Sequence, residues 1–338
     1  MLPDERFRFL DAATEFPVLR LTSPEHTSRL AAPWQRVVSR KRSFLLYSND
    51  RTGSAQLYQM MLDSGEARLL GTAADLDVSS PALSPDDRNA LYFDGPSLRQ
   101  VALGNLRERE LYRVRQGWRR GAGFSLSADG TAAVLVETDG ATWHVRRVAL
   151  TAREPEAVTL AEAREAIADP LVRPGRQDVI YRQGEGTLMF AGAGAAPRAL
   201  PLAAGGLGPA FWAGAGESIV YLNIPGAGRL NALRAFAPET GSDQLISATS
   251  QFAAFSPNAD ATVFIGASGS KAAPYLLLLL RVVRRELTVC EHRSSEPARV
   301  APIFSPDSQR AYFQSDRHGR PAIYAVDLER LVNDTAEE

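Results

Sequence analysis

Four histidines are the side chains of this sequence best suited to act as metal ligands or as general bases near neutral pH. They are His26, His144, His292 and His318, and they lie in widely separated stretches of the chain. His144 follows Trp143 in an apolar stretch and His318 lies in a turn, so we expect both to be structural. His26 and His292 remain candidates for a functional role. A site built from three histidine ligands is not expected, and we predict no bound metal.

Arginine, amide and acidic side chains offer a second kind of chemistry, the binding of an anion. A guanidinium group can bind a carboxylate through two parallel hydrogen bonds. The candidate ligand-binding residues lie near a repeated turn described below; they are Arg119, Arg120, Asp169, Gln183, Gln251 and Arg299. The candidates for a catalytic acid or base are His292, Asp169 and Glu296. The sequence contains no Gly-rich phosphate loop, no Gly-x-Ser-x-Gly elbow and no His-Glu-x-x-His.

A repeated turn followed by a short apolar run determines where these residues lie. The turns, which we call anchors, are Ser39-Arg40-Lys41, Ser84-Pro85-Asp86, Ser127-Ala128-Asp129, Arg173-Pro174, Ala213-Gly214, Ser256-Pro257-Asn258 and Ser305-Pro306-Asp307. The apolar runs behind them begin near residues 44, 91, 133, 179, 219, 263 and 311. A period of about 43 residues with short strands and turns is typical of a β-propeller that has one four-stranded blade per repeat. We therefore predict an all-β, seven-bladed propeller.

The last repeat has no good outer strand after Leu328-Glu329-Arg330-Leu331-Val332. The stretch from residue 16 to residue 22 resembles the outer strands of the other repeats, so we expect it to complete the last blade and close the ring. Closure would remove exposed sheet edges, which favour aggregation. We predict a single domain over residues 1–338, with blades over about 33–331. In such a ring the starts of the innermost strands converge on one mouth of the central channel.

Composition excludes several classes of partner. The formal net charge is −1, from 38 basic and 39 acidic residues, which favours neither nucleic acid nor a membrane surface. The single cysteine, Cys290, cannot form an internal disulfide, and its apolar neighbours indicate a buried strand residue. The apolar stretch from Pro274 to Leu280 is too short to span a bilayer and fits an inner strand buried on both faces. With no export signal at the start, we expect a cytoplasmic location.

The order of several segments resembles the oligogalacturonide (oligogalacturonate) lyase family. The resemblance runs along almost the whole chain and includes Ser48-Asn49-Asp50-Arg51-Thr52-Gly53, Gly117-Trp118, Asp169-Pro170-Leu171-Val172-Arg173-Pro174, Phe211-Trp212, His292-Arg293-Ser294-Ser295 and Pro302-Ile303-Phe304-Ser305-Pro306-Asp307. The resemblance implies a seven-bladed propeller that cleaves short pectic oligomers by β-elimination. It also implies manganese held by histidines and a glutamine, with a histidine as the base. The repeat itself also resembles the TolB-type propeller.

The family's metal and catalytic histidines are not matched in this sequence. The family's His-Pro before the fourth anchor reads Asp169-Pro170, and its Cys-His-Glu-Gly reads Arg182-Gln183-Gly184-Glu185-Gly186. Its fifth-blade Gly-His-Glu-Phe-Trp reads Gly208-Pro209-Ala210-Phe211-Trp212, its sixth-blade histidine falls at Phe252, and its His-Pro-His-Pro reads Arg299-Val300-Ala301-Pro302. Phe, Ala and Pro side chains offer a metal no lone pair. The fold is therefore expected to be retained and the metal chemistry lost.

Three functions fit these observations. The first is a divergent lyase-like propeller that binds a small anion or a uronate oligomer, using Arg299 with Arg119 or Arg120. The second is a protein-interaction propeller of the TolB or WD40-like kind, whose partner would bind one rim of the disc. The third is an active pectic-oligomer lyase with other catalytic residues. Whether the chain is an enzyme stays open, because fold alone does not decide function.

Overall fold

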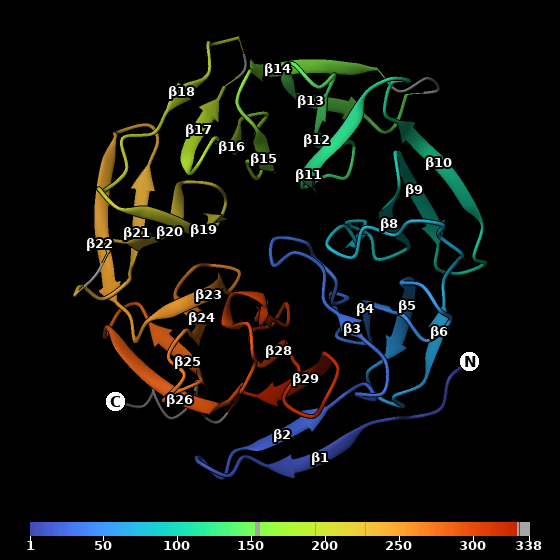
Figure 1. Ribbon diagram of the computed structural model, residues 1–338, viewed down its shortest axis with the longest axis vertical. Coiled ribbons are helices and arrows are strands. Elements are labelled where there is room, and N and C mark those ends of the chain that lie inside the picture. Colours follow the sequence, from blue (N-terminus) through green and yellow to red (C-terminus); the bar gives the residue numbers. More distant parts are fainter. Residues whose placement is uncertain (153–155, 193, 227, 330, 332–338) are drawn as a thin grey trace.

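The computed structural model describes residues 1–152, 156–192, 194–226, 228–329 and 331 of the chain. It is an all-β propeller in which small antiparallel sheets stand around a central axis (Figure 1). The single helical element named within the described residues is a 3-10 turn, η1 (Pro297–Arg299). Among those residues no helix has the length and apolar character needed to cross a membrane.

The first three repeats each supply four strands. They are β3 (Ser28–Arg29), β4 (Phe44–Asn49), β5 (Gln56–Met61) and β6 (Ala67–Leu69); β7 (Ala82–Leu83), β8 (Asn89–Asp94), β9 (Ser97–Ala102) and β10 (Glu108–Arg113); and β11 (Arg119–Leu126), β12 (Ala132–Thr138), β13 (Trp143–Ala149) and β14 (Ala157–Ala163). In each group the first strand lies nearest the axis and the last lies at the rim (Figure 1).

The later repeats follow the same plan. They are β15 (Ile167–Val172), β16 (Val179–Gln183), β17 (Thr187–Ala191) and β18 (Arg198–Ala199); β19 (Gly206–Ala213), β20 (Ser218–Ile224), β21 (Ala232–Ala237) and β22 (Ser242–Ala248); β23 (Phe252–Pro257), β24 (Val263–Ser268), β25 (Tyr275–Leu280) and β26 (Arg285–Glu291); and β27 (Ile303–Phe304), β28 (Arg310–Ser315) and β29 (Ala322–Asp327). Most of the apolar stretch from Pro274 to Leu280 forms β25, which lies between β24 and β26 and is buried on both faces, as predicted; it is the third strand of its sheet and not the one nearest the axis.

All seven predicted apolar runs lie in buried second strands, from β4 to β28. The repeats do not all form separate sheets, however. A single parallel pair, Ala122 with Ala168, joins β11 to β15, so the described residues form six hydrogen-bonded sheets, one of them eight-stranded. The propeller is thus confirmed, while the count of seven separate blades is not clearly reproduced by the sheets.

The ring is closed by the N-terminal strand, as predicted. β2 (Pro17–Arg20) pairs antiparallel with β29, and Val18 faces Val326. A further strand, β1 (Phe7–Leu10), which was not expected, pairs with β2 at the outer edge of the same sheet. Both strands lie beside β29 at the bottom of Figure 1.

Side-chain hydrogen bonds fix the anchor turns. The hydroxyl of Ser84 donates to Asp86 and accepts from the backbone N–H of Asn89, at 2.6 and 3.0 Å. The anchors at Ser127 and Ser305 repeat this pattern with a carboxylate two residues on and an N–H five residues on. A Ser side chain bound to nearby backbone is a usual way to hold a tight turn.

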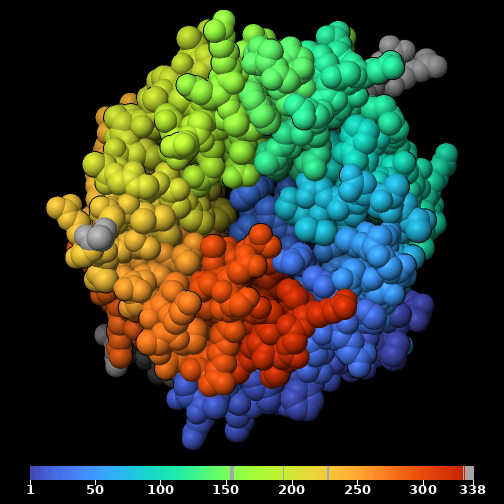
Figure 2. Space-filling view, in the orientation of Figure 1, coloured from blue at the N-terminus to red at the C-terminus, as the bar shows by residue number. Residues whose placement is uncertain are grey.

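Residues 31–36, which we call the plug, leave the first repeat and cross the central channel. The chain that follows β3 reaches into the centre of the disc (Figure 1), and the hollow seen from one face has a blue floor, the colour of this N-terminal part (Figure 2). Trp34 donates its indole N–H to the Phe124 carbonyl, at 3.1 Å, and packs against apolar clusters of the later repeats. The plug therefore separates two mouths, the strand-start mouth and the anchor-turn mouth.

Candidate functional site

The inner strands are irregular where they begin, at the strand-start mouth. Their pairing register breaks between residues 120 and 124 in β11, 168 and 171 in β15, 207 and 210 in β19, and 252 and 254 in β23. Register breaks of this kind redirect side chains and are frequent beside active sites. Most of the positions at which the family resemblance implies functional residues fall at or beside these breaks.

Asp169 occupies the break in β15 and forms an ion pair with Arg182 of β16, at 3.4 Å. The guanidinium of Arg182 also donates to the carbonyls of Leu207 and Gly208, so it connects β16 to the start of β19. Burial raises the pKa of Asp169, and the nearby Arg182 opposes that shift. Burial also lowers the pKa of Arg182, against the effect of Asp169. Desolvation is therefore the larger effect on both partners.

The backbone around Asp169 is tightly constrained. Asp169 has a φ of 51°, a left-handed conformation that few non-glycine residues adopt. Gly123 of β11 lies against it: a Cβ at Gly123 would be 2.9 Å from the Asp169 Cα atom. The parallel pair of Ala122 with Ala168 requires this close approach, which explains a glycine at position 123.

The two neighbouring arginines at the start of β11 differ in their contacts. Arg120 forms an ion pair with Asp77, at 2.7 Å, and its guanidinium lies 4.5 Å from the centre of the Phe93 ring. Arg119 is exposed, and no described residue forms an ion pair or hydrogen bond with its side chain. Of the two, only Arg119 can bind an added anion without losing a protein partner.

The remaining predicted ligand residues are dispersed around the same mouth. Gln183 donates to Glu165 through its side-chain amide. Gln251 is exposed, has a φ of 57° and accepts the N–H of Gly269 at its backbone carbonyl. Arg299, in η1, forms an ion pair of 2.8 Å with Glu296, and the two side chains are 63% and 59% exposed. The structure thus pairs Asp169 with Arg182, leaves Arg120, Gln183 and Arg299 in separate pairs, and leaves the side chains of Arg119 and Gln251 without a partner among the described residues.

His292 is not free to act as a base in this arrangement. The residue is fully buried at the end of β26, away from the inner strands. Its Nε2 lies 2.9 Å from the Ser268 carbonyl, and its Nδ1 accepts the Ser294 N–H at 3.0 Å. Burial lowers the pKa of His292, which favours the neutral ring. Because both nitrogens already have backbone partners, its role is structural.

Nothing in the described part of the chain matches a manganese site made of histidines. No three His, Cys, Asp or Glu side chains gather there in a way that could hold a metal ion. His144 stacks on Trp118 with ring centres 4.6 Å apart, and His318 bonds to the Tyr324 hydroxyl at 2.8 Å. Phe252 is fully buried in the core, beneath Gly266, and does not face the channel. The side chains present therefore do not fit the cofactor that the resemblance implies.

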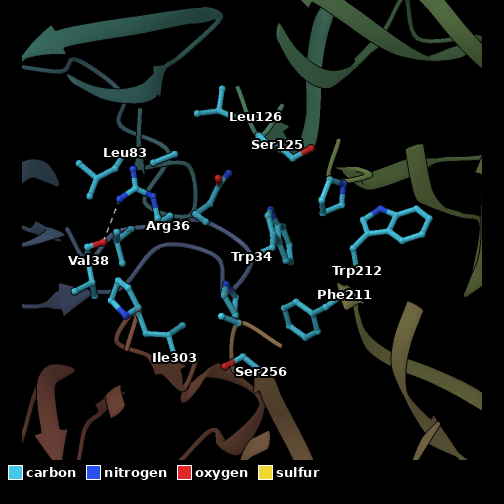
Figure 3. A pocket seen from close by; sticks show the side chains of 18 of the residues that line it. Trp34, Arg36, Val38, Leu83, Ser125, Leu126, Phe211, Trp212, Ser256 and Ile303 are labelled. Atoms are coloured by element: carbon cyan, nitrogen blue, oxygen red, sulfur yellow. Dashed lines mark hydrogen bonds between the residues drawn. The ribbon is translucent and has the colours of Figure 1, made fainter. Parts of the chain in front are cut away.

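A cavity of about 780 Å³ lies at the other end of the channel, the anchor-turn mouth. None of the predicted site residues lines it. Its walls include Trp34 and Gln35 of the plug together with Phe211 and Trp212 of β19 (Figure 3). Sequence reasoning missed this cavity, although an aromatic pair just before an anchor and a Pro33-Trp34-Gln35 stretch before another were visible.

Comparisons with known proteins agree with the resemblance found in the sequence. The oligogalacturonate lyase family model matches residues 3–152. An oligogalacturonide lyase of Pectobacterium atrosepticum is 23% identical and an oligogalacturonate lyase of Dickeya dadantii is 22% identical; each match covers 94% of both chains. These findings confirm the resemblance to the oligogalacturonate lyases over nearly the whole chain.

Solved structures show the same fold. An oligogalacturonate lyase in complex with manganese superposes with a TM-score of 0.88 at 22% identity, covering 97% of this chain and 98% of that one. The oligogalacturonate lyase of Vibrio parahaemolyticus also gives 0.88, at 20% identity, covering 97% of each chain. TolB from Acinetobacter baumannii is more distant, with a TM-score of 0.51 at 13% identity, covering 78% of this chain and 62% of that one.

Proposed function

We propose that this relative of the oligogalacturonate lyases is a single-domain propeller of seven repeats that binds a small anion or an acidic sugar at the strand-start mouth. In this proposal its metal-dependent lyase chemistry is lost or altered. The observation that supports it is a contrast between side chains. Arginines are open to an added anion, whereas the candidate histidine has no nitrogen left to bind a metal or accept a proton. Arg119 is unpaired among the described residues and Arg299 is exposed, whereas His292 has no free ring nitrogen.

Arginine side chains suit this task for a physical reason. A guanidinium group stays charged at any ordinary pH and presents donors in a planar fork that matches a carboxylate. An acidic oligosaccharide carries a carboxylate on each residue, so several separated arginines around one mouth can each take one. The ion pair of Arg299 with Glu296 is exposed, and exposed pairs contribute little stability, so a ligand carboxylate can compete with Glu296.

β-Elimination would need more than binding. A base must remove the proton beside the carboxylate, and positive charge must stabilise the resulting anion. Asp169 is the remaining candidate base at this mouth, but Arg182 is its ion-pair partner. Glu296 is likewise paired, with Arg299. We therefore expect binding without rapid cleavage.

Thermal-shift measurements with digalacturonate, phosphate and a neutral disaccharide test the binding. Arg299→Ala should reduce the response to digalacturonate. Arg113→Ala is the matched control, because Arg113 forms an equivalent exposed pair with Glu110 three residues before it, at the end of an outer strand. A ligand at one hundred times its dissociation constant adds about 2.7 kcal/mol of stability. Equal responses of both variants and of the natural sequence would remove Arg299 from the site.

The loss of lyase activity is tested separately. Digalacturonate and trigalacturonate are incubated with the protein and added manganese, and the unsaturated product is followed by its near-ultraviolet absorbance. We expect little or no product. Turnover of about 1 s⁻¹ or faster, an ordinary enzymatic rate, would contradict the proposal.

A further inference from the structure

The anchor-turn mouth holds a cavity that the proposed function does not use. Its volume of about 780 Å³ lies within the range of small-molecule sites, roughly 300 to 1,000 Å³. The plug stands between this cavity and the charged residues of the strand-start mouth. A molecule bound here would therefore occupy a site of its own.

One wall of the cavity is aromatic. Trp34 of the plug lies near the Phe211 ring, while Trp212, the next residue of β19, projects to the other face of that strand (Figure 3). Leu83, Leu126 and Ile303 add aliphatic surface from other inner strands. Trp212 is held in place, because its indole N–H donates to the Leu171 carbonyl at 3.0 Å. Such walls favour a ligand with a flat aromatic or aliphatic part, whose apolar surface is removed from water on binding.

Two polar side chains in the cavity wall have unused hydrogen-bonding capacity. Gln35 is 6% exposed; its amide donates to the Phe124 carbonyl at 2.8 Å, and its own side-chain oxygen accepts nothing from the described residues. Ser125 is 8% exposed; its hydroxyl oxygen accepts the Val172 N–H at 2.9 Å, while the hydroxyl proton has no acceptor there. The Gln35 oxygen can still accept a hydrogen bond and the Ser125 hydroxyl can still donate one, so a ligand hydroxyl group could bond to both.

The charged side chains that line the cavity within the described residues are all positive. Its described lining residues include Arg36 and Arg40 and contain no aspartate or glutamate. Arg36 is already bound to Asp87 and to the Ser84 carbonyl. Arg40 is exposed, and its side chain has no hydrogen-bond or ion-pair partner among the described residues. The Asp87 carboxylate, outside the lining, accepts the Arg40 backbone N–H at 2.8 Å and forms an ion pair with Arg36, so the Arg40 guanidinium is the charge left for an anionic group on an apolar body.

We propose that this cavity binds a small amphipathic carboxylate, an aromatic acid that carries a ring hydroxyl group. The ring would lie against Trp34 and Phe211, and the carboxylate would bind Arg40. The hydroxyl group would pair with Gln35 and Ser125. This ligand class differs from the acidic sugar of the strand-start mouth in having a flat apolar ring.

Isothermal titration calorimetry with 6-hydroxy-2-naphthoate tests the proposal. Its neutral analogue, 6-hydroxy-2-naphthylmethanol, measures the contribution of charge. Arg40→Ala should weaken naphthoate binding about three- to tenfold, the effect of one solvent-exposed charged hydrogen bond, and should leave the neutral analogue unchanged. Arg164→Ala is the matched control, since it removes an exposed arginine that has no hydrogen-bond or ion-pair partner among the described residues and lies outside the cavity lining; it should change neither affinity.

Three outcomes would overturn the proposal: no naphthoate binding at about 1 mM, which corresponds to about −4 kcal/mol; equal affinity for the acid and its neutral analogue; or an Arg40→Ala affinity equal to that of the natural sequence. Excess trigalacturonate should not displace the naphthoate, so failure here and failure of the proposed sugar site give different results.

Two of the four tryptophans line the cavity, so naphthoate should also quench tryptophan fluorescence. An unchanged spectrum at saturating naphthoate would place the ligand elsewhere.

Discussion

At the strand-start mouth most polar side chains already have protein partners, whereas at the anchor-turn mouth several do not. Asp169 is paired with Arg182, Arg120 with Asp77 and Arg299 with Glu296. Gln35 and Ser125, by contrast, keep unused capacity in the wall of an apolar cavity.

The difference affects how each mouth can bind a ligand. A ligand at the strand-start mouth must compete with existing ion pairs everywhere except at Arg119, so its net gain is small at the paired residues. A ligand at the anchor-turn mouth adds hydrogen bonds and buries aromatic surface without breaking contacts. A count of charged residues alone would suggest that the strand-start mouth is the better binding site.

Phe252→His tests whether the strand-start mouth could regain a family-like histidine. Of the variants in this section, it should lower the free energy of unfolding most. The side chain of Phe252 is fully buried, so a histidine there would place a polar ring in the core. We expect a loss of about 3 kcal/mol in the free energy of unfolding, measured with urea. Manganese should not stabilise the variant. A metal-dependent rise in its melting temperature would show that position 252 does face the channel.

Trp34→Ala tests the separation of the two mouths. The variant removes a half-buried ring that packs against two apolar clusters across the channel. We expect it to lower the free energy of unfolding by about 2 to 3 kcal/mol. Trp34→Phe keeps a ring but loses the hydrogen bond to Phe124, and should cost about 1 kcal/mol. If both variants cost the same, the ring itself contributes little to holding the plug.

Asp169→Asn tests the pairing at the strand-start mouth and its dependence on pH. Removing the charge relieves a desolvation cost that exceeds the attraction of Arg182, so at pH 7 the variant should be as stable as the natural sequence or more stable, by no more than about 1 kcal/mol. Since burial raises the pKa of Asp169, the folded protein takes up a proton more readily than the unfolded chain.

This group therefore makes folding more favourable as the pH falls through the raised pKa towards the ordinary value of 3.8. The difference in unfolding free energy between the natural sequence and Asp169→Asn should change in that range, with the natural sequence gaining. A constant difference from pH 7 to about pH 4, where a free aspartate begins to protonate, would contradict the raised pKa.

Asp129→Asn is expected to give the smallest effect and probes an anchor turn beside the other mouth. The Ser127 hydroxyl and the Thr131 N–H lower the pKa of Asp129 from 3.8 to about 2. Its stabilising contribution is present above pH 3.8 and is lost as the pH falls towards 2. Because the carboxylate is exposed, we expect less than about 1 kcal/mol at pH 6. Acid unfolding curves of the two proteins should converge near pH 2, and parallel curves would rule this role out.

Much of the fold could be predicted because the repeat is a local signal. Each anchor turn and the buried strand behind it are encoded within about ten residues, so the pattern of turn and apolar residues was sufficient. The pairing of residues 16–22 with the last repeat followed from a missing strand, and β2 with β29 confirms it. The parallel contact of Ala122 with Ala168 carries no such local signal.

The site was less accessible to sequence reasoning. A register break shifts every following side chain to the opposite face, so the pattern could not show that Phe252 faces the core. Arg182 and Asp169 are partners only through the fold, and the plug reads as an ordinary stretch before an anchor. Hydrogen bonds from Trp34 and Gln35 to Phe124 link residues far apart in the chain and have no signature in the sequence.

The closing strand also has a consequence for how the molecule folds. Val18 cannot find Val326 until nearly the whole chain is available, so the sheet that joins them must be completed late. The separate hairpins of the other repeats can form earlier, because their strands are close in sequence and their loops close quickly. Until β2 arrives, β29 presents an open edge to other unfolded chains. The slowest step of folding, and the one most exposed to aggregation, should therefore be ring closure rather than the formation of any single blade.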